Sequence, residues 1–527
     1  MDVYGTKLKP TLHEWTDIIE GIVETGESPL VGEPIYNLNR EDTREFDAII
    51  IGGGAAGRFC GAFLRARGGR ALIVDKWPFL GGSCPHEACV PHHVFSDAAR
   101  ELDLARIMAG KLWYDKEWAE GKRVSILEIR DMFVNGRGLA HALMNLQTKD
   151  QLDVEFILNT AATVIDKNTV EVAGVQYKTR SVVLATGART QLPDIPGLEQ
   201  KGVYDFATLI SDLDYEPTKC VIIGGSKIAI EYGSFFQAAG IPTTILTRSG
   251  LMSPNSLHHV DEDLRNFVVD GMITRGIEVI KGIEPLEVTG DGKQVSGVRY
   301  RTADGGEAHV EADFVFIATG ERPLSKPFVD ALGIDVDEKG NIKVDWTCET
   351  SVKGVYAVGD LIGPPLEMFK ARKTGTVAAR NIMGEHFEWD YTDFADFLHS
   401  TYEVVWMGLS EKEAREKYKN VVIIKMPVDG IPPEDFGLPA GDGSMFIAMT
   451  RPELSGFFKI VFDGDSRKLI GAHYVGYGVK NAFQYLEVLM KQGITIDELG
   501  QVNELFLNDL IPQLCRLRAG QAVLRDL

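Results

Sequence analysis

Short runs of consecutive apolar residues recur through the first two thirds of the chain and predict buried strands of parallel sheets, which are covered on both faces. Strands that alternate with helices are typical of nucleotide-binding α/β domains. From about residue 388 the runs suit an antiparallel sheet, with a helix at about 481–492. The pattern predicts two Rossmann-like α/β domains and a C-terminal α+β domain. The runs comprise residues 46–51, 71–74, 182–184, 220–223, 243–247, 314–318, 355–358, 404–406, 421–424, 456–461 and 469–473.

The first strand leads into a glycine-rich turn that predicts a dinucleotide site. Gly52, Gly54 and Gly57 satisfy the G-x-G-x-x-G spacing, and the next strand ends in Asp75. Such glycines allow a tight turn and the close approach of a pyrophosphate to the helix N-terminus, while the carboxylate accepts from a ribose hydroxyl. The strand, helix, second strand and carboxylate occur in the required order, which makes the motif specific.

A second turn of this kind follows the strand at 220–223, but it is degraded. Gly224 keeps the first glycine, whereas Ser226 stands at the second glycine position and an alanine at the third. The next strand ends in Arg248, which cannot accept from a 2′-hydroxyl but can pair with a 2′-phosphate. This arginine favours NADPH over NADH; the alternative is an ordinary surface arginine.

Two near-repeats predict where the chain crosses between the nucleotide-binding domains. The strands at 182–184 and 314–318 both run into Ala-Thr-Gly, and a later strand ends in Gly-Asp. Apolar residues at helical spacing in 11–23 predict one helix in an arm that packs on the main body. The predicted division is an arm at 1–45, a first nucleotide-binding domain at 46–190 and 319–387, a second at 191–318, and an interface domain at 388–527.

Length and charge narrow the class of protein. A chain of 527 residues exceeds what one hydrophobic core supports. The net charge of −21 argues against nucleic acid or an anionic membrane surface as a partner, because both bind basic footprints. Neither a spanning segment nor a secretory signal is visible. Six cysteines, only two of them closely spaced, fit a reducing compartment. We therefore expect a cytoplasmic multidomain enzyme.

The closely spaced pair is Cys84 and Cys89, just after the strand that ends in Asp75. This position favours a redox-active thiol pair delivered to the edge of a flavin. A five-residue step on a regular helix separates side chains by about 140°, so a disulfide here needs an irregular or newly started helix. The alternative is a zinc site that adds His92 and His93, although structural zinc sites prefer a distant second pair.

The two turns, the C-x4-C just past the first, the two Ala-Thr-Gly crossings, the late Gly-Asp and the α+β tail together resemble the flavin-dependent disulfide oxidoreductases. The resemblance covers residue 46 to the end. It implies FAD on the first domain, NADPH on the second, and a homodimer whose active sites are each completed by the partner's C-terminal domain. Gly187 and Asp360 thereby join the cofactor-binding residues. The family's lysine near the flavin pairs with a glutamate; His92 and Glu231 stand at these places.

A narrower resemblance extends over essentially the whole chain. The segments 84–93 and 367–373, Arg58 and the N-terminal arm are similar to the 2-ketopropyl-coenzyme M oxidoreductase/carboxylases. That family uses NADPH to cleave the thioether of 2-ketopropyl-coenzyme M and carboxylates the resulting enolate to acetoacetate. The resemblance implies that Cys84 attacks the substrate sulfur and that Cys89 lies beside the flavin. A helix N-terminus would favour the Cys84 thiolate.

The same resemblance assigns further site residues. Arg58 and Arg372 match arginines that bind the sulfonate of coenzyme M, for which a guanidinium offers a fixed fork of donors. Each could instead be a salt-bridged surface residue. His86, His141 and Met144 match residues that line a carbon dioxide pocket. The residues alone indicate only that the last two form an i,i+3 pair on a helix face, which more often packs than binds ligand.

Near the C-terminus the chain departs from the broad family, which places a His–Glu pair there to exchange protons with the thiols. Phe506 occupies the expected position, as in the carboxylases. An apolar ring would exclude acid and water, so that the enolate survives until carbon dioxide reacts. The carboxylases keep a histidine shortly afterwards, where this chain has Ile511. This difference leaves carboxylation open.

The expected function is NADPH-driven reduction of the Cys84–Cys89 disulfide in a dimeric FAD enzyme, followed by cleavage of a coenzyme M thioether ketone and carboxylation of the enolate. A plain disulfide or mixed-disulfide reductase is one alternative. A thioether reductase on another sulfonate substrate is a second, and a flavin-bound scaffold without turnover is a third. The intact cysteine pair argues against the scaffold.

Overall fold

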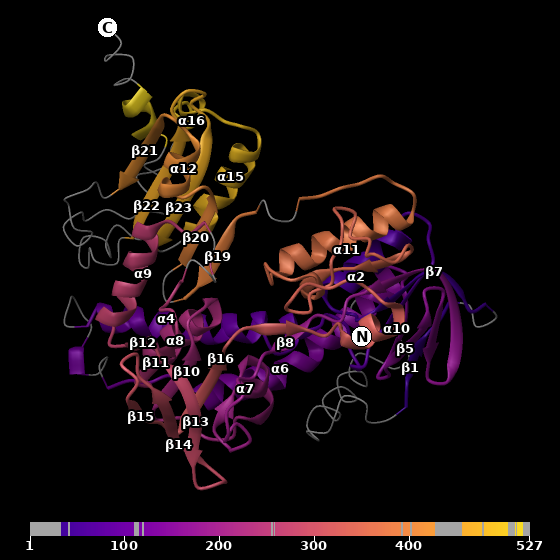
Figure 1. The fold of residues 1–527 in the computed structure, drawn as a ribbon, viewed down its shortest axis with the longest axis horizontal. Coiled ribbons are helices and arrows are strands. Elements are labelled where there is room, and N and C mark those ends of the chain that lie inside the picture. Colours follow the sequence, from indigo (N-terminus) through magenta and orange to yellow (C-terminus); the bar gives the residue numbers. More distant parts are fainter. Residues whose placement is uncertain are drawn as a thin grey trace.

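The computed structural model describes most of the chain and contains three units, of which the first is formed by two separate stretches of the sequence (Figure 1). The predicted helix at 11–23, Phe506 and Ile511 lie outside the described residues. None of the described helices is long and apolar enough to cross a membrane. The described residues are 33–39, 43–109, 115–117, 121–253, 257, 259–390, 394–400, 403–426, 456–476, 479–503, 512 and 514–519.

The first unit is a mixed sheet with a buried parallel centre. In spatial order its strands are β1 (Ile35–Asn37), β4 (Glu155–Leu158), β3 (Ala71–Val74), β2 (Glu45–Ile51), β7 (Val175–Leu184), β6 (Thr169–Val172) and β5 (Ala162–Asp166), with β18 (Val355–Ala357) on β7. The apolar runs form β2, β3, β7 and β18, which pair in parallel. β1, β5 and β6 are antiparallel additions that no apolar run predicts.

Two helices of the first unit pack closely on each other, namely α2 (Ala55–Arg65) and α11 (Met368–Ile382) (Figure 1). Their approach requires a glycine, because a Cβ on Gly375 would lie 2.1 Å from the Ala56 carbonyl oxygen. α2 begins at the first glycine turn, whereas α11 comes more than 300 residues later. The packing therefore brings distant parts of the sequence together beside the turn.

The second unit is a parallel sheet whose core includes a cluster of aromatic rings, among them the buried Phe235, Phe236 and Phe314. In spatial order its strands are β12 (Glu278–Lys281), β11 (Thr243–Thr247), β10 (Cys220–Gly224), β16 (Phe314–Ala318) and β9 (Val203–Tyr204). A three-stranded sheet and three helices complete it. They are β13 (Glu284–Gly290), β14 (Val295–Arg301), β15 (Glu307–Glu311), α7 (Phe206–Asp212), α8 (Lys227–Ala238) and α9 (Glu262–Thr274).

The chain passes between the first two units at a pair of short strands. β8 (Ala188–Thr190) and β17 (Glu321–Pro323) pair in antiparallel fashion, each directly after one of the Ala-Thr-Gly segments. The two near-repeats thus lie side by side. The exact division of the chain into domains stays a prediction.

The third unit is an antiparallel sheet covered by helices, as the C-terminal apolar runs predict. Its strands, in spatial order, are β19 (Asp396–His399), β20 (Glu403–Gly408), β23 (Leu469–Gly476), β22 (Phe457–Asp463) and β21 (Val421–Met426), and its helices are α12 (Glu411–Lys417), α15 (Val479–Lys491) and α16 (Ile496–Leu499). β19 is a strand that the sequence pattern misses. The predicted fold class, α/β with an α+β C-terminal domain, is confirmed.

Several helices join the units. α4 packs against α8 of the second unit and against α6, so the segment that starts at Cys89 leads from the first unit to the second (Figure 1). The cysteine pair therefore lies between units. These remaining elements are α3 (Ser83–His86), α4 (Cys89–Ile107), α6 (Ile126–Leu146), η1 (Gln147–Gln151), α10 (Lys326–Leu332) and η2 (Gly359–Ile362).

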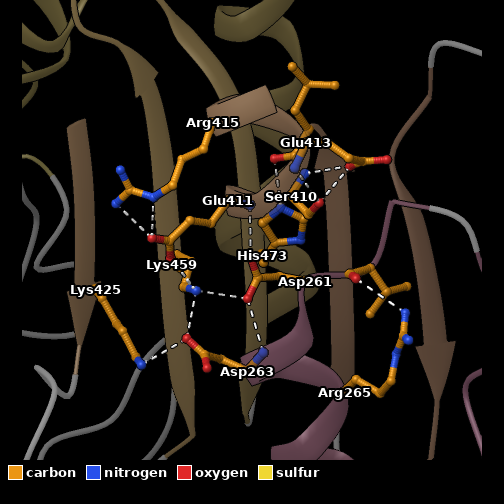
Figure 2. A network of polar contacts seen from close by, with 12 residues as sticks. Asp261, Asp263, Arg265, Ser410, Glu411, Glu413, Arg415, Lys425, Lys459 and His473 are labelled. Atoms are coloured by element: carbon orange, nitrogen blue, oxygen red, sulfur yellow. Dashed lines mark hydrogen bonds and ion pairs between the residues drawn. The ribbon is translucent and has the colours of Figure 1, made fainter. Parts of the chain in front are cut away.

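A buried ion cluster fixes the third unit on the second (Figure 2). Lys459 Nζ, on β22, lies 2.9 Å from Asp261, 2.6 Å from Asp263 and 2.7 Å from Glu411. Asp261 caps α9 by accepting from the Asp263 N–H. Burial raises the pKa of Asp261, but the neighbouring His473, Lys459 and the Glu411 N–H together lower it. One ammonium thus holds three carboxylates from two units.

Replacing Lys459 with methionine should destabilise the protein by about 3 kcal/mol, because it leaves buried carboxylates without their cation. Chemical denaturation at pH 7 would measure the loss. The loss should shrink as the pH falls, since the carboxylates protonate more readily once the cation is gone. Lys425→Met is the control, because Lys425 is more exposed than Lys459 and pairs with Asp263, one of the carboxylates that Lys459 also holds. Equal losses in the two variants would contradict the central role of Lys459.

Candidate active site

A cavity of about 910 Å³ lies where the three units meet. Its wall contains the first glycine turn, the cysteine pair, the start of α8 and part of β19. The volume is at the upper end of the range for small-molecule and cofactor sites. Many of the residues that the sequence singles out line it. They are Gly52, Gly54, Asp75, Cys84, Cys89, His92, Gly187, Glu231 and Asp360.

The first glycine turn leaves no room for side chains, as the approach of a pyrophosphate requires. Gly52 has φ +106°, and a Cβ there would lie 2.3 Å from the Ala185 carbonyl oxygen. A Cβ on Gly57 would lie 1.9 Å from the Gly52 oxygen. Asp75 accepts from the Gly53 N–H at 2.5 Å, yet its oxygens keep further lone pairs for a ribose hydroxyl. The turn and the carboxylate therefore fit FAD.

The second turn keeps this tight geometry despite its altered sequence. A Cβ on Gly224, whose φ is +144°, would lie 2.1 Å from the Ala318 oxygen. Ser226 is the N-cap of α8, and Arg248 is exposed directly after β11. These positions suit a nucleotide laid across the N-terminus of α8, with a 2′-phosphate near Arg248. Selection of NADPH by Arg248 stays a prediction.

Cys84 and Cys89 belong to different helices, which removes the angular conflict of a single regular helix. α3 follows Gly82 and ends at His86, and α4 begins at Cys89. Both residues are free thiols, and the Cys84 sulfur accepts a hydrogen bond from Cys89. That hydrogen bond, helped by the positive charge of Arg372, lowers the pKa of Cys84, whereas the same bond and burial raise the pKa of Cys89. The asymmetry favours Cys84 as the nucleophile.

We expect the reduced enzyme to react with iodoacetamide at Cys84 well below the pH at which an ordinary thiol reacts. A lowered pKa preserves the thiolate as the pH falls past about 8.5, the usual cysteine value. The pH midpoint of the alkylation rate should therefore lie below that of free cysteine. Arg372→Met should raise this midpoint. Lys373→Met, which removes a neighbouring charge, should leave it in place. A midpoint equal to that of free cysteine would contradict the assignment.

Arg372 lies close enough to Cys84 for its charge to act on the thiol, and Arg58 lies close to Arg372. Met368 Sδ is 3.3 Å from Cys84 Sγ, and Arg372 follows one helical turn later on α11. The Arg372 guanidinium lies 5.2 Å from the ring centre of Phe59, the neighbour of Arg58. Burial and the charge of Arg372 lower the pKa of Arg58. Within the described part of the chain no carboxylate pairs with either arginine, so both charges are available to an anion.

The two histidines and the methionine predicted to line a gas pocket form a buried cluster beside the thiol pair. His86 Nδ1 lies 3.1 Å from His141 Nε2, and the His141 ring stacks on Phe79 with centres 4.0 Å apart. Met144 packs at Gly81, where a Cβ would lie 2.5 Å from its sulfur. Burial lowers the pKa of His141 to about 3 and that of His86 well below its ordinary value. Both rings are therefore neutral near pH 7.

Lys227 is a cavity residue that the sequence analysis missed. Its ammonium pairs with Glu367 and, at 2.9 Å, with Asp396, so one cation connects all three units. Burial raises the pKa of Glu231 to about 7, and the charge of Lys227 opposes that rise. A signal was present in the sequence. A lysine at the first position of a helix opposes the helix dipole, and such a broken local rule often marks a site.

The predicted partnership of His92 with Glu231 stays a prediction. His92 Nε2 lies 3.2 Å from Ser96 Oγ, and its ring centre is 5.1 Å from that of Tyr232, the residue after Glu231. Glu231 accepts from the His399 backbone N–H at 2.8 Å. Among the described residues no group of three or more potential ligands is arranged to hold a metal ion.

The sequence profile of the pyridine nucleotide-disulphide oxidoreductases matches residues 46–380. The profile of the dimerisation domain of the same group matches residues 394–504. The first profile alone covers more than half of the chain, and the two together cover nearly all of the three units.

Individual relatives agree with these profiles. A mercuric reductase from Lysinibacillus sphaericus is 26% identical over 461 residues, which cover 86% of this chain and 79% of that protein. A dihydrolipoyl dehydrogenase from Bacillus subtilis is 26% identical over 469 residues, which cover 86% and 92%. The HOCl-induced flavoprotein disulfide reductase RclA from Escherichia coli superposes with a TM-score of 0.72 at 20% identity, over 89% of this chain and 99% of RclA. The last similarity establishes the shared fold.

Proposed function

This chain belongs to the pyridine nucleotide-disulphide oxidoreductase family, and on that premise we propose that it reductively cleaves a sulfonate-tailed thioether ketone, with 2-ketopropyl-coenzyme M as the leading substrate. Members of the family use FAD and NAD(P)H, and bound FAD supplies the transfer of electrons from the nicotinamide to the Cys84–Cys89 disulfide. Arg248 favours NADPH as the donor. A homodimer with shared active sites and a cytoplasmic location belong to the same proposal.

The two thiols perform the reductive cleavage of the thioether in two steps. The Cys84 thiolate attacks the thioether sulfur, and the bond from that sulfur to the ketone side breaks, so the carbon leaves with the electron pair as an enolate. Cys84 is then disulfide-bonded to coenzyme M. Cys89 attacks Cys84 Sγ, its proton passes to the departing coenzyme M thiolate, and the Cys84–Cys89 disulfide forms again. The enolate carbon has then gained the two electrons of the pair.

The observation that carries this proposal is a pair of neighbouring arginines, Arg58 and Arg372, of which Arg372 helps to lower the pKa of Cys84. Neither arginine pairs with a carboxylate among the described residues, and the charge of Arg372 acts on both Arg58 and Cys84. A sulfonate keeps its charge at every biological pH and accepts hydrogen bonds from a guanidinium fork. A substrate with an anionic tail a few bonds from its reacting sulfur fits this arrangement.

The surroundings of the thiol pair favour carboxylation of the enolate over its protonation. An imidazole with a pKa of about 3, as in His141, carries no extra proton near pH 7 that could quench an enolate. Burial also lowers the pKa of His86 well below its ordinary value. Phe506, which would exclude acid from the partner side of the site, lies outside the described residues. Carbon dioxide as co-substrate therefore belongs to the proposal.

A product assay tests the proposal. The purified holoenzyme would be incubated with NADPH and 2-ketopropyl-coenzyme M, with and without bicarbonate, and acetoacetate and acetone would be quantified. We expect acetoacetate that depends on bicarbonate. Acetone alone would retain thioether cleavage and reject carboxylation. Absence of both products, although NADPH reduces the flavin, would reject the substrate class.

A reductase without carboxylation is the second candidate, because the curated relatives above are mercuric reductases and dihydrolipoyl dehydrogenases. Cys84 and Cys89 would then pass their electrons to a disulfide, a mixed disulfide, a metal ion or another thioether. Oxidation of NADPH by small disulfides or Hg²⁺, at a rate far above that with the thioether ketone, would favour this candidate.

A further inference from the structure

The turn that follows α6 holds Arg58 from a part of the chain about 90 residues away. η1 is a short π-helix, an uncommon conformation that frequently occurs at functional sites. The Arg58 Nε–H donates to Thr148 Oγ1 at 2.8 Å, and another guanidinium N–H donates to Gln147 Oε1. Two adjacent residues of the turn thus accept from two nitrogens, Nε and Nη2, of one guanidinium.

The hydroxyl of Thr148 is locked in the acceptor role. Thr148 Oγ1 donates its own proton to the Met144 carbonyl oxygen at 2.8 Å, so only its lone pairs can face Arg58. Thr148 is fully buried. Met144 in turn packs at Gly81, close to the start of the helix that carries Cys84. The orientation of Arg58 is therefore coupled, through one turn of backbone, to the wall of the thiol site.

Both acceptors are neutral, and this has a consequence for charge. A guanidinium is usually fixed by a carboxylate, which also cancels its charge. Gln147 and Thr148 fix the plane of Arg58 but leave its full positive charge and its other N–H groups for a ligand. The nearby charge of Arg372 adds to the same field, as the lowered pKa of Arg58 reflects.

We propose that Gln147 and Thr148 are positioning residues that aim the Arg58 guanidinium at the anionic tail of the substrate and keep it unneutralised. The inference rests on the proposed function, since it takes the tail to be a sulfonate. It predicts that selectivity for anionic over neutral ligands at Cys84 depends on two uncharged residues that need not touch the ligand.

Two thiol reagents that differ in charge test the proposal. Reduced holoenzyme would be treated with 2-sulfonatoethyl methanethiosulfonate or with methyl methanethiosulfonate, and the loss of free thiols would give a rate constant for each. Both reagents transfer a thioalkyl group to Cys84 and release methanesulfinate, so the neutral reagent corrects for changes in thiol reactivity or folding. The ratio of the rate constants reports only on the anionic tail.

We expect the wild-type ratio, compared with that for free cysteine, to favour the sulfonate reagent by about tenfold, the effect of one charge-assisted hydrogen bond. Gln147→Glu should lower the ratio about tenfold because it neutralises Arg58, and Thr148→Val should lower it several-fold. Thr148→Ser keeps the hydroxyl and should therefore retain the wild-type ratio. Lys149→Gln makes the same change in net charge in the same turn and should alter the ratio less than about twofold.

The outcomes separate the two claims. A wild-type preference for the sulfonate reagent that persists unchanged in Gln147→Glu and Thr148→Val would overturn the positioning role while leaving the anion site intact. A wild-type enzyme without any preference would overturn the sulfonate site of the proposed function and the positioning role with it. If the ratio of the rate constants fell equally in Lys149→Gln, the effect would come from the net charge of the turn. That result would also overturn the positioning role.

Discussion

Turnover should fall by roughly 10³-fold or more when Cys84 is replaced by serine, the scale of loss seen when an enzyme loses its nucleophile. Serine has nearly the shape of cysteine, but its hydroxyl is not ionised near neutral pH and cannot form a mixed disulfide. Cys84 is the thiol whose pKa the structure lowers, and its sulfur lies against Met368 on α11, the helix that also carries Arg372. No other described thiol has both features, because Cys60, Cys220, Cys348 and Cys515 are buried and the pKa of Cys89 is raised.

The same variant should still accept electrons from NADPH, since Cys84 supports neither glycine turn. Stopped-flow spectroscopy at the flavin band would show reduction in the first half-reaction, while the product assay would show none in the second. Cys220→Ala is the matched control, because it removes a thiol from a strand of the second unit far from the cavity wall. Substantial turnover in Cys84→Ser would contradict the assignment of the nucleophile.

The second large effect should come from the arginine pair. Replacing both Arg58 and Arg372 with methionine should raise KM for the sulfonate-tailed substrate by roughly 10³-fold, because two charge-assisted hydrogen bonds of about 2 kcal/mol each are lost. In the proposed function both arginines bind a part of the substrate that does not react, so kcat should change far less than KM. Steady-state kinetics with each single variant and with the double variant would measure the changes in KM and kcat separately.

A neutral analogue of the substrate supplies the internal control for this effect. An alkyl thioether ketone without the sulfonate should bind the wild-type enzyme poorly and should lose little further in the double variant. Lys373→Met, at the position after Arg372 on α11, removes the same charge from a side chain that packs over Trp389 and should leave KM nearly unchanged. Equal losses for anionic and neutral substrates would show that the arginines support the fold rather than the ligand.

Local sequence was sufficient for the fold class and for the elements that carry cofactor-binding residues. The apolar runs predicted β2, β3, β10, β11 and β16, because a strand covered on both faces needs an uninterrupted apolar run wherever it stands. The glycine turns could also be predicted, since a close backbone approach admits only glycine. The carboxylate was recognised from its place at the end of the next strand. β1, β5 and β19 were missed, because short strands at sheet edges have no such requirement, and the interior strands β4 and β6 were missed as well.

The candidate site could be predicted only in part from the sequence, because several of its contacts join distant segments. The spacing of Cys84 and Cys89 indicated a thiol pair, but whether one helix or two carried it was decided by the break between α3 and α4. The pairing of Arg58 with Gln147 and Thr148 joins segments about 90 residues apart, and no local spacing encodes such a contact.

The sequence by itself determined that this protein has two nucleotide-binding turns, a neighbouring thiol pair and a third, α+β unit, because each of these is a property of adjacent residues. The tertiary structure decided which thiol has the lowered pKa, which arginines are left without carboxylates, and that Lys227 joins Glu367 to Asp396. Those properties depend on burial and on charges supplied by distant segments, and both exist only once the chain has folded.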